Sequence, residues 1–560
     1  MNKKFTRREA LIGASSVVLL GATFGKASAF GKMHPSPDMT ATYQHGIASG
    51  DPDTTSVVIW TRVSNANKKT AITWRVATDR HMQTIKAQGQ FITGASRDYT
   101  VKVVVENLQP GESYFYQFDL DGELSVVGQT KTLPVGHVDS LVLAVATCSN
   151  YPFGYFNAYD VIANDSAVDV VVHLGDYIYE YGQDGYGGET GKRIGRNHQP
   201  THEIVTLADY RQRHGQYKTD VSAQAMHARH PMIVIWDDHE SANNPWMGGA
   251  ENHQQGEGNW DKRRADSLQA YYEWLPIRDP VSGGSQQDYW RHYKFGDLLS
   301  LITLETRHTG RSQQIDTDDY LGEIKNKDDA QTFINDVVGA PDRKLLSGEM
   351  EQFLTEQMTE SVSAHRRWRV IGSSSVIGKR IAPDLSDPVS ASYRETLTGD
   401  ALKRLDSLTH LGSLGLPVDL DSWNGYPAAR EDFYQISKEA GAQDLLVISG
   451  DSHSYWQNEL YDATGHAMGV ELGATGVTSP RSLLQLGNEG LKHYDEQNAL
   501  QNPEVVWTDG RYRGFIRLEI NHDGAHADFV TVSSVESPSY EVNTVRSVDI
   551  EPHEGTLRYK

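Results

Sequence analysis

Polar side chains that can bind metal ions follow four apolar stretches of the sequence. The stretches are Ser140–Thr147, Val168–Leu174, Pro231–Trp236 and Leu445–Ile448. The polar residues just beyond them are Cys148, Asn150, Asp176, Tyr179, Asp237, Asp238, His239, Glu240, Asp451 and His453. In open α/β sheets the loops at the carboxyl ends of the strands meet at one edge and bind ligands there. The four groups are therefore expected to form one site.

Asp176 and Tyr179 stand three residues apart, just after Gly175. This spacing would let the carboxylate bridge two cations while the phenolate reaches one of them, and phenolate is a ligand for ferric iron. Cys148 would add a thiolate. Taken singly, a buried cysteine is usually a small apolar residue, and Asp-Tyr after a strand is usually a turn or a helix cap. Their joint occurrence at strand ends favours a metal site.

Three further carboxylates, Asp237, Asp238 and Asp451, supply the hard oxygen ligands that suit Ca²⁺ or Mn²⁺. His453 supplies an imidazole, which suits transition metals. The mixed set of donors predicts a site for unlike metals.

His239 lies inside the acidic run Asp237–Glu240. It could protonate a leaving group or position an anion, because imidazole titrates near neutrality. Alternatively, it could be another metal ligand or a support for one. Asn243 and Asn244, just beyond, could bind a metal or the substrate through the amide oxygen, or could cap a helix.

The formal net charge of −22 argues against nonspecific nucleic-acid binding and against a role as a nucleic-acid scaffold. An anionic substrate would have to be attracted locally, and Arg211 and Arg213 are candidates because the guanidinium fork fits phosphate oxygens. Residues two apart on a helix point in different directions, so at most one should face the site. We take Arg211 as a catalytic candidate; the alternative is a salt bridge to a surface acid.

From Pro134 onward, apolar strands alternate with helical segments, which predicts an α/β domain with a buried sheet. Besides the four stretches above, strands are expected at Leu298–Leu304 and Trp368–Gly372, and a hairpin at Phe515–Ile520 and Ala527–Val532. The expected helices are Tyr155–Asn164, Leu207–Lys218, Lys262–Trp274, Gly348–Ser361 and Glu431–Ala440.

Residues Tyr43–Leu133 contain short alternating strands separated by turn residues, which predicts a β-sandwich. Within it, Leu108–Tyr116 resembles the turn and tyrosine strand of fibronectin type III modules. Three long segments, Gly182–Asn197, Trp246–Asn259 and Ile381–Gly425, are expected to be loops.

The N-terminus has the three parts of an export signal. Arg7 and Arg8 precede the apolar stretch Ile12–Gly25, and Ala27–Ala29 offers a cleavage site. We therefore expect residues 1–29 to be a twin-arginine-type signal peptide, recognised by the twin-arginine translocation machinery. The mature protein would be periplasmic or secreted, without stable membrane insertion. With Cys148 as the single cysteine, an intrachain disulfide is excluded.

At six motifs the sequence resembles the PhoD-type alkaline phosphatases and phosphodiesterases of the metallophosphatase superfamily. The motifs are His45–Pro52 (HGIASGDP), Val58–Arg62 (VIWTR), Thr147–Asn150 (TCSN), His173–Glu180 (HLGDYIYE), Trp236–Glu240 (WDDHE) and Ser449–His453 (SGDSH). The resemblance runs from about Tyr43 to the C-terminal strands.

The resemblance implies an exported phosphoesterase with a fibronectin III-like all-β sandwich at residues 40–134. It also implies a metallophosphatase core, two layered β-sheets flanked by helices, at 138–535, and a C-terminal extension at 536–560. The site of this family is related to that of purple acid phosphatases and holds Fe³⁺ with Ca²⁺.

By this likeness, iron would be bound by Cys148, Asp176 and Tyr179, and Asp176 would bridge the metals. Asp238 would take the position of the second-metal amide ligand, and His239 that of the catalytic histidine. The metal set would be completed by Asp451 and His453. The likeness leaves open how Asp237, Asn150 and Asn243 divide between metals and substrate. Ser373–Ser375 follows a strand where related enzymes often place another ligand, but it offers only hydroxyls.

The expected function is hydrolysis of phosphate monoesters and diesters by metal-activated water. One alternative is a phospholipase D-like phosphodiesterase that acts on lipid or cell-wall polymer diesters. Another is a noncatalytic surface-binding protein whose second domain has lost activity.

Overall fold

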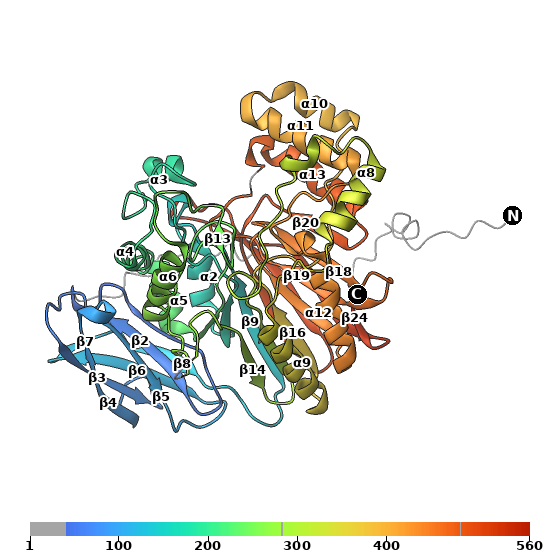
Figure 1. Cartoon of the computed structure of the whole chain (residues 1–560). Helices are drawn as coiled ribbons and strands as arrows, with labels where there is room; N and C mark the ends of the chain where they lie inside the picture. Colours follow the sequence, from blue (N-terminus) through green and yellow to red (C-terminus); the bar gives the residue numbers. More distant parts are fainter. Residues whose placement is uncertain (1–40, 282–283, 482) are drawn as a thin grey trace.

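The computed structural model describes residues 41–560 except 282–283 and 482. The expected signal peptide, residues 1–29, lies outside the described residues. Two large sheets are layered face to face between helices, with a smaller β module beside them (Figure 1). Among the described residues, no helix is long and apolar enough to span a membrane.

The first large sheet has ten strands with a parallel centre, in which β10 pairs with both β9 and β11. Its order is β24 (Thr556–Tyr559), β23 (Val542–His553), β22 (Ala525–Val532), β21 (Arg513–Asn521), β9 (Ser140–Ala146), β10 (Val170–His173), β11 (Met232–Val234), β1 (Ile47–Gly50), β2 (Val57–Arg62) and β5 (Thr100–Val105). The expected C-terminal hairpin is confirmed as β21 and β22, and β23 and β24 extend the sheet beyond it.

The second large sheet has seven strands, of which β15, β16, β17 and β19 are parallel. Its order is β14 (Arg291–Phe295), β15 (Leu299–Thr303), β16 (Trp368–Gly372), β17 (Leu445–Ser449), β19 (Ala467–Gly473), β18 (Tyr455–Tyr461) and β20 (Val505–Asp509). The strands expected at Leu298–Leu304, Trp368–Gly372 and Leu445–Ile448 are thus confirmed.

Alternate side chains of each central strand serve two different cores, because successive residues of a strand point to opposite faces. Val145 and Val172 of the first sheet pack between the sheets with Leu301 and Ile448 of the second. Their neighbour Ala144 faces the helices on the outer side. This double burial explains why these strands are apolar runs rather than alternating ones.

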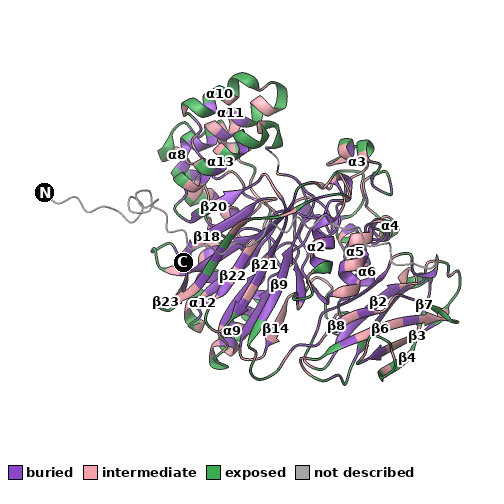
Figure 2. Ribbon diagram, turned by 180° about the vertical axis from the view of Figure 1, so that it is seen from behind, coloured by how far each residue is buried: buried purple, intermediate pink, exposed green. Residues whose placement is uncertain are grey.

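Helices cover the outer face of each large sheet. On the first sheet they are α2 (Asn157–Asn164), α4 (Leu207–Tyr217), α5 (Val221–Arg229) and α6 (Trp260–Trp274). On the second they are α9 (Gly348–Ser363) and α12 (Pro427–Ala440). Seen from behind, the central strands are largely buried, whereas the outer helices expose one side (Figure 2). The expected helices are confirmed with small shifts at their ends.

The strands of the N-terminal module belong to two sheets. A separate five-stranded sheet consists of β4 (Ile85–Thr93), β3 (Thr70–Ala77), β6 (Ser113–Leu120), β7 (Glu123–Leu124) and β8 (Gly128–Lys131). The remaining strands, β1, β2 and β5, continue the ten-stranded sheet, because Gly50 of β1 pairs in parallel with Met232 of β11. The module is therefore joined to the central sheet by backbone pairing.

The expectation of a loop at Ile381–Gly425 was wrong. This segment contains α10 (Pro388–Thr396) and α11 (Gly399–Leu414), which lie with α13 (Gly487–Gln501) and α8 (Lys327–Thr332) at one end of the molecule (Figure 1). The sequence signal for α11 is a leucine at every third position, from which Leu405 and Leu408 pack against Leu491. Shorter elements are α3 (Gly188–Ile194), α7 (Asp318–Leu321), β12 (Pro245–Trp246) and β13 (Gly249–Ala250).

Candidate metal centre

The predicted donor residues come together at the carboxyl ends of β9, β10, β11 and β17. They form three groups in which the ligand atoms lie within 4.8 Å of one another. The groups are Cys148, Asp176 and His453; Asp176, Asp238 and His239; and Asp237, Asp238 and Asp451. Because Asp176 and Asp238 are shared, the three groups form one continuous cluster.

The turns after β10 and β11 approach each other so closely that only glycine fits between them. Gly175 has φ +102°, and a Cβ there would lie 2.5 Å from the backbone nitrogen of Asp237. The buried Glu240 carboxylate then holds both turns, because it accepts the backbone N–H groups of Asp176, Tyr177 and Asp237 at 3.0, 2.5 and 2.7 Å. Burial raises the pKa of Glu240 to about 7.

Four of the donor residues have left-handed backbone conformations that non-glycine residues rarely adopt. The φ angles are +58° at Cys148, +55° at Asp176, +63° at Asp451 and +53° at His453. Each such residue costs on the order of 1–3 kcal/mol, and such strain gathers at functional sites. The strained turns direct these side chains toward a common centre.

The first group lies around the Tyr179 hydroxyl, which donates to Asp176 Oδ2 at 2.7 Å and lies 3.2 Å from His453 Nε2. His453 Nδ1 lies 2.9 Å from the carbonyl of Pro480, an arrangement that places the proton on Nδ1 and leaves the Nε2 lone pair facing the cluster. Burial lowers the pKa of His453 to about 3 and raises that of Cys148 well above its usual value. Without a metal, the histidine is neutral and the cysteine is a thiol.

The second side of the cluster is a buried Asp–Arg network. Arg307, fully buried, lies 2.5 Å from Asp237 Oδ1 and 2.6 Å from Asp421 Oδ2. Burial raises the pKa of Asp237 to about 6, although Arg307 opposes the shift. For Asp451, burial and the neighbouring Asp237 raise the pKa well above the usual range. Without a neighbouring cation, burial therefore disfavours the charged form of these carboxyl groups.

His239 is held by a carboxylate on one ring nitrogen and faces the cluster with the other. Its Nδ1 lies 2.7 Å from Glu180 Oε2, and its Nε2 lies 3.8 Å from Asp238 Oδ2. Burial opposes protonation, but Asp238, Glu180 and Asp176 together raise the pKa of His239 well above its usual value. The surrounding carboxylates thus favour the protonated form of His239, and the contact with Glu180 leaves Nε2 facing the cluster.

Several buried acceptor atoms of the cluster lack a hydrogen-bond partner within the described chain. They are Asp176 Oδ1, Asp237 Oδ2, Asp238 Oδ1 and Asn150 Oδ1. Buried polar atoms are normally paired, because an unpaired one costs roughly 1–3 kcal/mol. Oxygen atoms of this kind, beside a thiol and an imidazole, fit metal ions as the missing partners.

The two asparagine candidates differ in placement. The Asn150 side chain is fully buried, and both of its amide atoms lack a hydrogen-bond partner among the described residues. The Asn243 side chain donates instead to Glu251 at 3.1 Å, while its backbone N–H donates to Glu180 at 2.8 Å. Asn150 is thus the stronger candidate for a ligand in the site, and Asn243 lies at its rim.

Arg211 does not join the cluster. It makes a two-point salt bridge with Glu273 at 2.6 and 2.7 Å and donates to the carbonyl of Ser96, so it ties α4 to α6 and to the N-terminal module. Its neighbour Arg213 is buried and donates to the backbone carbonyls of Tyr179, Gln199 and Pro200. Arg211 thus forms a salt bridge, but with the buried Glu273 rather than with a surface acid. Arg213 supports the turn that carries Tyr179.

The hydroxyls of the segment Ser373–Ser375 take part in hydrogen bonds within the fold. The Ser373 hydroxyl donates to the carbonyl of Ser375 at 2.7 Å, and the Ser374 hydroxyl lies 3.0 Å from that of Thr306. The second of these contacts joins the ends of β15 and β16. The segment belongs to the scaffold beneath the cluster.

Sequence reasoning missed Arg307 as well as the supporting roles of Glu180 and Glu240. Arg307 lies in the polar run Glu305–His308, which follows β15 after one further residue, Leu304. The signal used for the other strand ends, a polar run after an apolar strand, would have found it. The pairing of Glu180 with His239 joins two turns that are 59 residues apart in sequence, and no local pattern indicates it.

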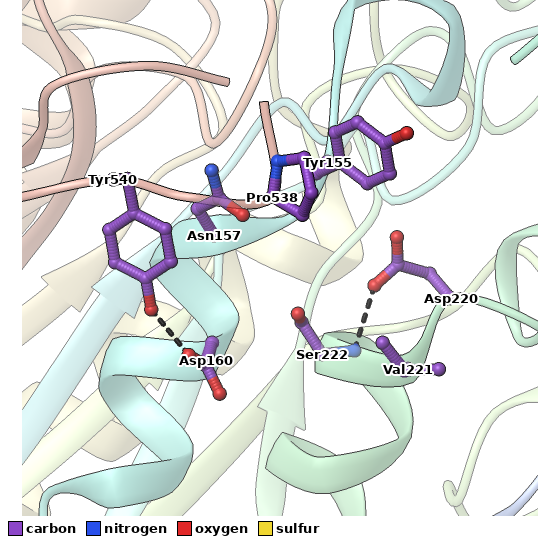
Figure 3. A pocket seen from close by; sticks show the side chains of 8 residues that line it. All are labelled: Tyr155, Asn157, Asp160, Asp220, Val221, Ser222, Pro538 and Tyr540. Carbon is purple, nitrogen blue, oxygen red and sulfur yellow. Dashed lines mark hydrogen bonds between the residues drawn. The ribbon is translucent and has the colours of Figure 1, made fainter. Parts of the chain in front are cut away.

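A separate small pocket lies between α2, α5 and the chain near Tyr540 (Figure 3). Asp160 accepts the Tyr540 hydroxyl on one side, and Asp220 caps α5 through Ser222 on the other. Its volume of about 20 Å³ is close to that of one water molecule. This pocket anchors the C-terminal segment to two helices and is too small for an organic ligand.

The chain is similar to known proteins over most of its length. The model of the PhoD-like phosphatase family matches residues 143–529, and that of the PhoD-like phosphatase N-terminal domain matches residues 28–134. Alkaline phosphatase D of Bacillus subtilis (strain 168) is 31% identical over 577 residues, which cover 100% of this chain and 89% of that protein. A solved structure described as "Structure of PhoD" is 31% identical with a TM-score of 0.75, covering 93% of this chain and 92% of that one. The chain belongs to the PhoD-like phosphatase family and is a phosphoesterase.

Proposed function

We propose that this phosphoesterase depends on Fe³⁺ and Ca²⁺ and hydrolyses both phosphate monoesters and diesters by metal-activated water. The observation that carries the proposal is the set of buried acceptor oxygens without partners, on Asp176, Asp237, Asp238 and Asn150. Bound cations would satisfy these atoms and neutralise the buried carboxylates.

In this proposal the iron would be held by Cys148, Asp176 and Tyr179, and Asp176 would bridge to the calcium side. The calcium side would be formed by Asp237, Asp238 and Asp451, and His453 would complete the metal set through Nε2. When bound, the metal ions would supply positive charge to phosphoryl oxygens and would acidify a water molecule. Support comes from the donor types: the Cys148 thiol and the Tyr179 hydroxyl lie on one side, and carboxylates lie on the other.

His239 would donate a proton from Nε2 to the leaving oxygen, and Glu180 would fix the ring by accepting from Nδ1. The contact of 2.7 Å between Nδ1 and Glu180 supports this role, because it defines which nitrogen faces the cluster. Arg307 would hold Asp237 in place and balance some of the buried charge.

We propose further that residues 1–29 direct export through the twin-arginine translocation machinery to the periplasm or the exterior. Residues 40–134 would form a fibronectin III-like module, residues 138–535 the catalytic domain and residues 536–560 an extension. Support for the module comes from its all-β composition, and its backbone pairing with β11 argues that it is rigidly attached to the rest of the enzyme.

Elemental analysis of the purified protein is expected to find both iron and calcium. Chelation of calcium should abolish hydrolysis of p-nitrophenyl phosphate, and added Ca²⁺ should restore it. Cys148→Ala should lose iron and activity together. If neither metal is found and Cys148→Ala retains full activity, the metal assignment is wrong.

A side-by-side comparison of p-nitrophenyl phosphate with bis-p-nitrophenyl phosphate tests the substrate class. We expect turnover of both. Hydrolysis of the diester alone would instead favour the phospholipase D-like alternative, and a strong monoester preference would exclude it.

Glu180→Gln is expected to lower kcat by roughly 10- to 100-fold, because the carboxylate that holds His239 Nδ1 and favours its protonation is lost. The alkaline limb of the pH profile should shift to lower pH, since the pKa of His239 falls. The measurement is kcat against pH, with Glu349→Gln at an exposed position of α9 as the matched control. An unchanged pH profile would show that Glu180 does not control the protonation of His239.

A further inference from the structure

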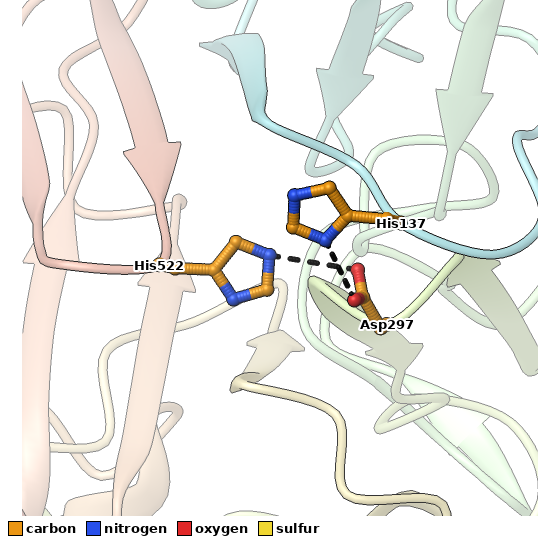
Figure 4. Close-up of side chains that lie close together, drawn as sticks. All are labelled: His137, Asp297 and His522. Carbon is orange, nitrogen blue, oxygen red and sulfur yellow. Dashed lines mark hydrogen bonds and ion pairs between the residues drawn. The ribbon is translucent and has the colours of Figure 1, made fainter.

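Two histidines and an aspartate meet at the edge of the sheets opposite the candidate metal centre (Figure 4). His137 precedes β9, His522 follows β21, and Asp297 lies in the turn between β14 and β15. Cys148 of the metal centre follows the other end of β9, a strand of 7 residues. At about 3.3 Å per residue the two places are roughly 20 Å apart. The three side chains are therefore independent of the phosphoesterase site.

Both imidazole rings direct a nitrogen at the same carboxylate. His137 Nδ1 lies 2.9 Å from Asp297 Oδ2, and His522 Nε2 lies 3.5 Å from Asp297 Oδ1. His522 Nε2 also lies 3.1 Å from the carbonyl oxygen of Val138 and donates to it, so this nitrogen would release its proton when it binds an ion. One ligand atom of each of the three side chains lies within 4.8 Å of those of the other two. The rings are stacked, with centroids 4.9 Å apart and an interplanar angle of 19°. The three donor atoms thus converge on one point.

Backbone contacts fix the loops that carry these side chains. The N–H of Asp297 donates to the carbonyl of Gly136 at 2.9 Å, and the N–H of Val138 donates to Asp297 Oδ1 at 3.0 Å. Arg367 links the turn at Asp297 to the turn at His522. Its backbone N–H donates to the carbonyl of Asp297, and its side-chain Nε–H donates to the carbonyl of His522. The donors are held by the fold before any ligand arrives.

The stacking of the rings favours a divalent cation over two ion pairs. Asp297 lies beside both rings, and Asp139 Oδ1 lies 3.3 Å from His137 Nε2, so each ring has a carboxylate next to it. Two protonated imidazoles stacked at this distance would nevertheless repel each other. Neutral rings with a dication remove this repulsion and use both nitrogens as ligands. Imidazole nitrogen with a carboxylate oxygen suits Zn²⁺ and similar transition metals better than Ca²⁺, which prefers oxygen.

We propose that His137, Asp297 and His522 form a second metal site, which binds one divalent transition metal ion of the Zn²⁺ type. The side chains of His137 and Asp297 are 66% and 42% exposed, so the ion has access from solvent. Water can complete a tetrahedral set of ligands.

Metal binding at this site would join three segments that are far apart in sequence. Residues 134–139 connect the N-terminal module to β9, Asp297 belongs to the second large sheet, and His522 to the first. Because an unfolded chain does not hold the three donors together, the ion binds the folded state preferentially and stabilises it. The function of the site would be to fasten the linker and both sheets at one edge.

The test uses the holoenzyme loaded with the metals of its catalytic centre and inorganic Zn²⁺ as the probe. Equilibrium dialysis at pH 8 is expected to find one more bound Zn²⁺ per chain than in His522→Gln. Both His137→Gln and His522→Gln should weaken this binding at least tenfold, and Zn²⁺ should not raise the melting temperature of either variant as it does that of the unaltered protein. Hydrolysis of p-nitrophenyl phosphate should be unchanged in both variants.

His526→Gln is the matched control. His526 is also partly exposed and contacts two carboxylates, Asp528 at 3.2 Å and Asp549 at 2.7 Å, but no second imidazole belongs to that group among the described residues. The His526→Gln variant should bind Zn²⁺ like the unaltered protein. Equal Zn²⁺ binding by all four proteins would overturn the proposal. So would a crystal grown with Zn²⁺ whose anomalous map at the zinc edge has no peak between the three side chains.

Discussion

Asp176→Asn is expected to lose bound metal and to lower kcat by more than about 100-fold. Asp176 is buried, its Oδ2 accepts the Tyr179 hydroxyl, and its Oδ1 has no hydrogen-bond partner in the described chain. An amide keeps the size of the side chain but removes the negative charge and one of the two acceptor oxygens. The neutral amide oxygen that remains is a much weaker ligand for two cations than a carboxylate oxygen. Iron content and turnover should therefore fall together.

Tyr177→Phe, one position along the same turn, is the control. The Tyr177 hydroxyl lies 2.8 Å from His227 Nε2, on the side away from the cluster, so its removal should leave metal content and kcat close to normal. The loss of this buried hydrogen bond should cost about 1 kcal/mol of stability. If Asp176→Asn retains the iron content of Tyr177→Phe, the bridging role is wrong.

Arg307→Met is expected to lower the free energy of unfolding of the metal-free protein by about 3–5 kcal/mol. Arg307 is fully buried and pairs with Asp237 and Asp421. Methionine at this position leaves the buried Asp237 carboxylate without its arginine partner, whereas Asp421 keeps its contact with Arg311. Added metal should recover some of the loss, because a cation at Asp237 supplies the missing positive charge. The measurement is urea unfolding with and without metal.

Arg394→Met serves as the comparison for an exposed pair. Arg394 makes a salt bridge of 2.7 Å with Asp406 in which both side chains are largely in solvent, so the unfolding midpoint should not change. A loss of stability that is equal in both variants would indicate that the Arg307 network contributes no more than a surface pair. Failure of metal to recover the Arg307→Met protein would place the cation away from Asp237.

The regular elements of the fold could be predicted because their signals are local. The apolar runs at β10 and β17 are buried on both faces of their sheets. Strands buried in this way are largely apolar, and this pattern is visible in the sequence. The segment Ile381–Gly425 was misread because its glycine and polar residues obscured the leucine period of α11. The pairing of the N-terminal strand β1 with β11 could not be predicted, because strands so distant in sequence leave no local pattern of their pairing.

The sequence by itself determined which residue types stand at the strand ends, and parallel strands necessarily bring those ends to one edge. Cys148, Asp176, Asp238 and His453 could be named for this reason alone. The tertiary structure decided which charged side chains pair with the residues of the cluster. Arg211 and Arg307 both pair with a carboxylate, yet one contacts Glu273 on the helices and the other Asp237 inside the cluster. The choice depends on where each side chain is buried after the two sheets pack together, and no spacing along the chain carries that information.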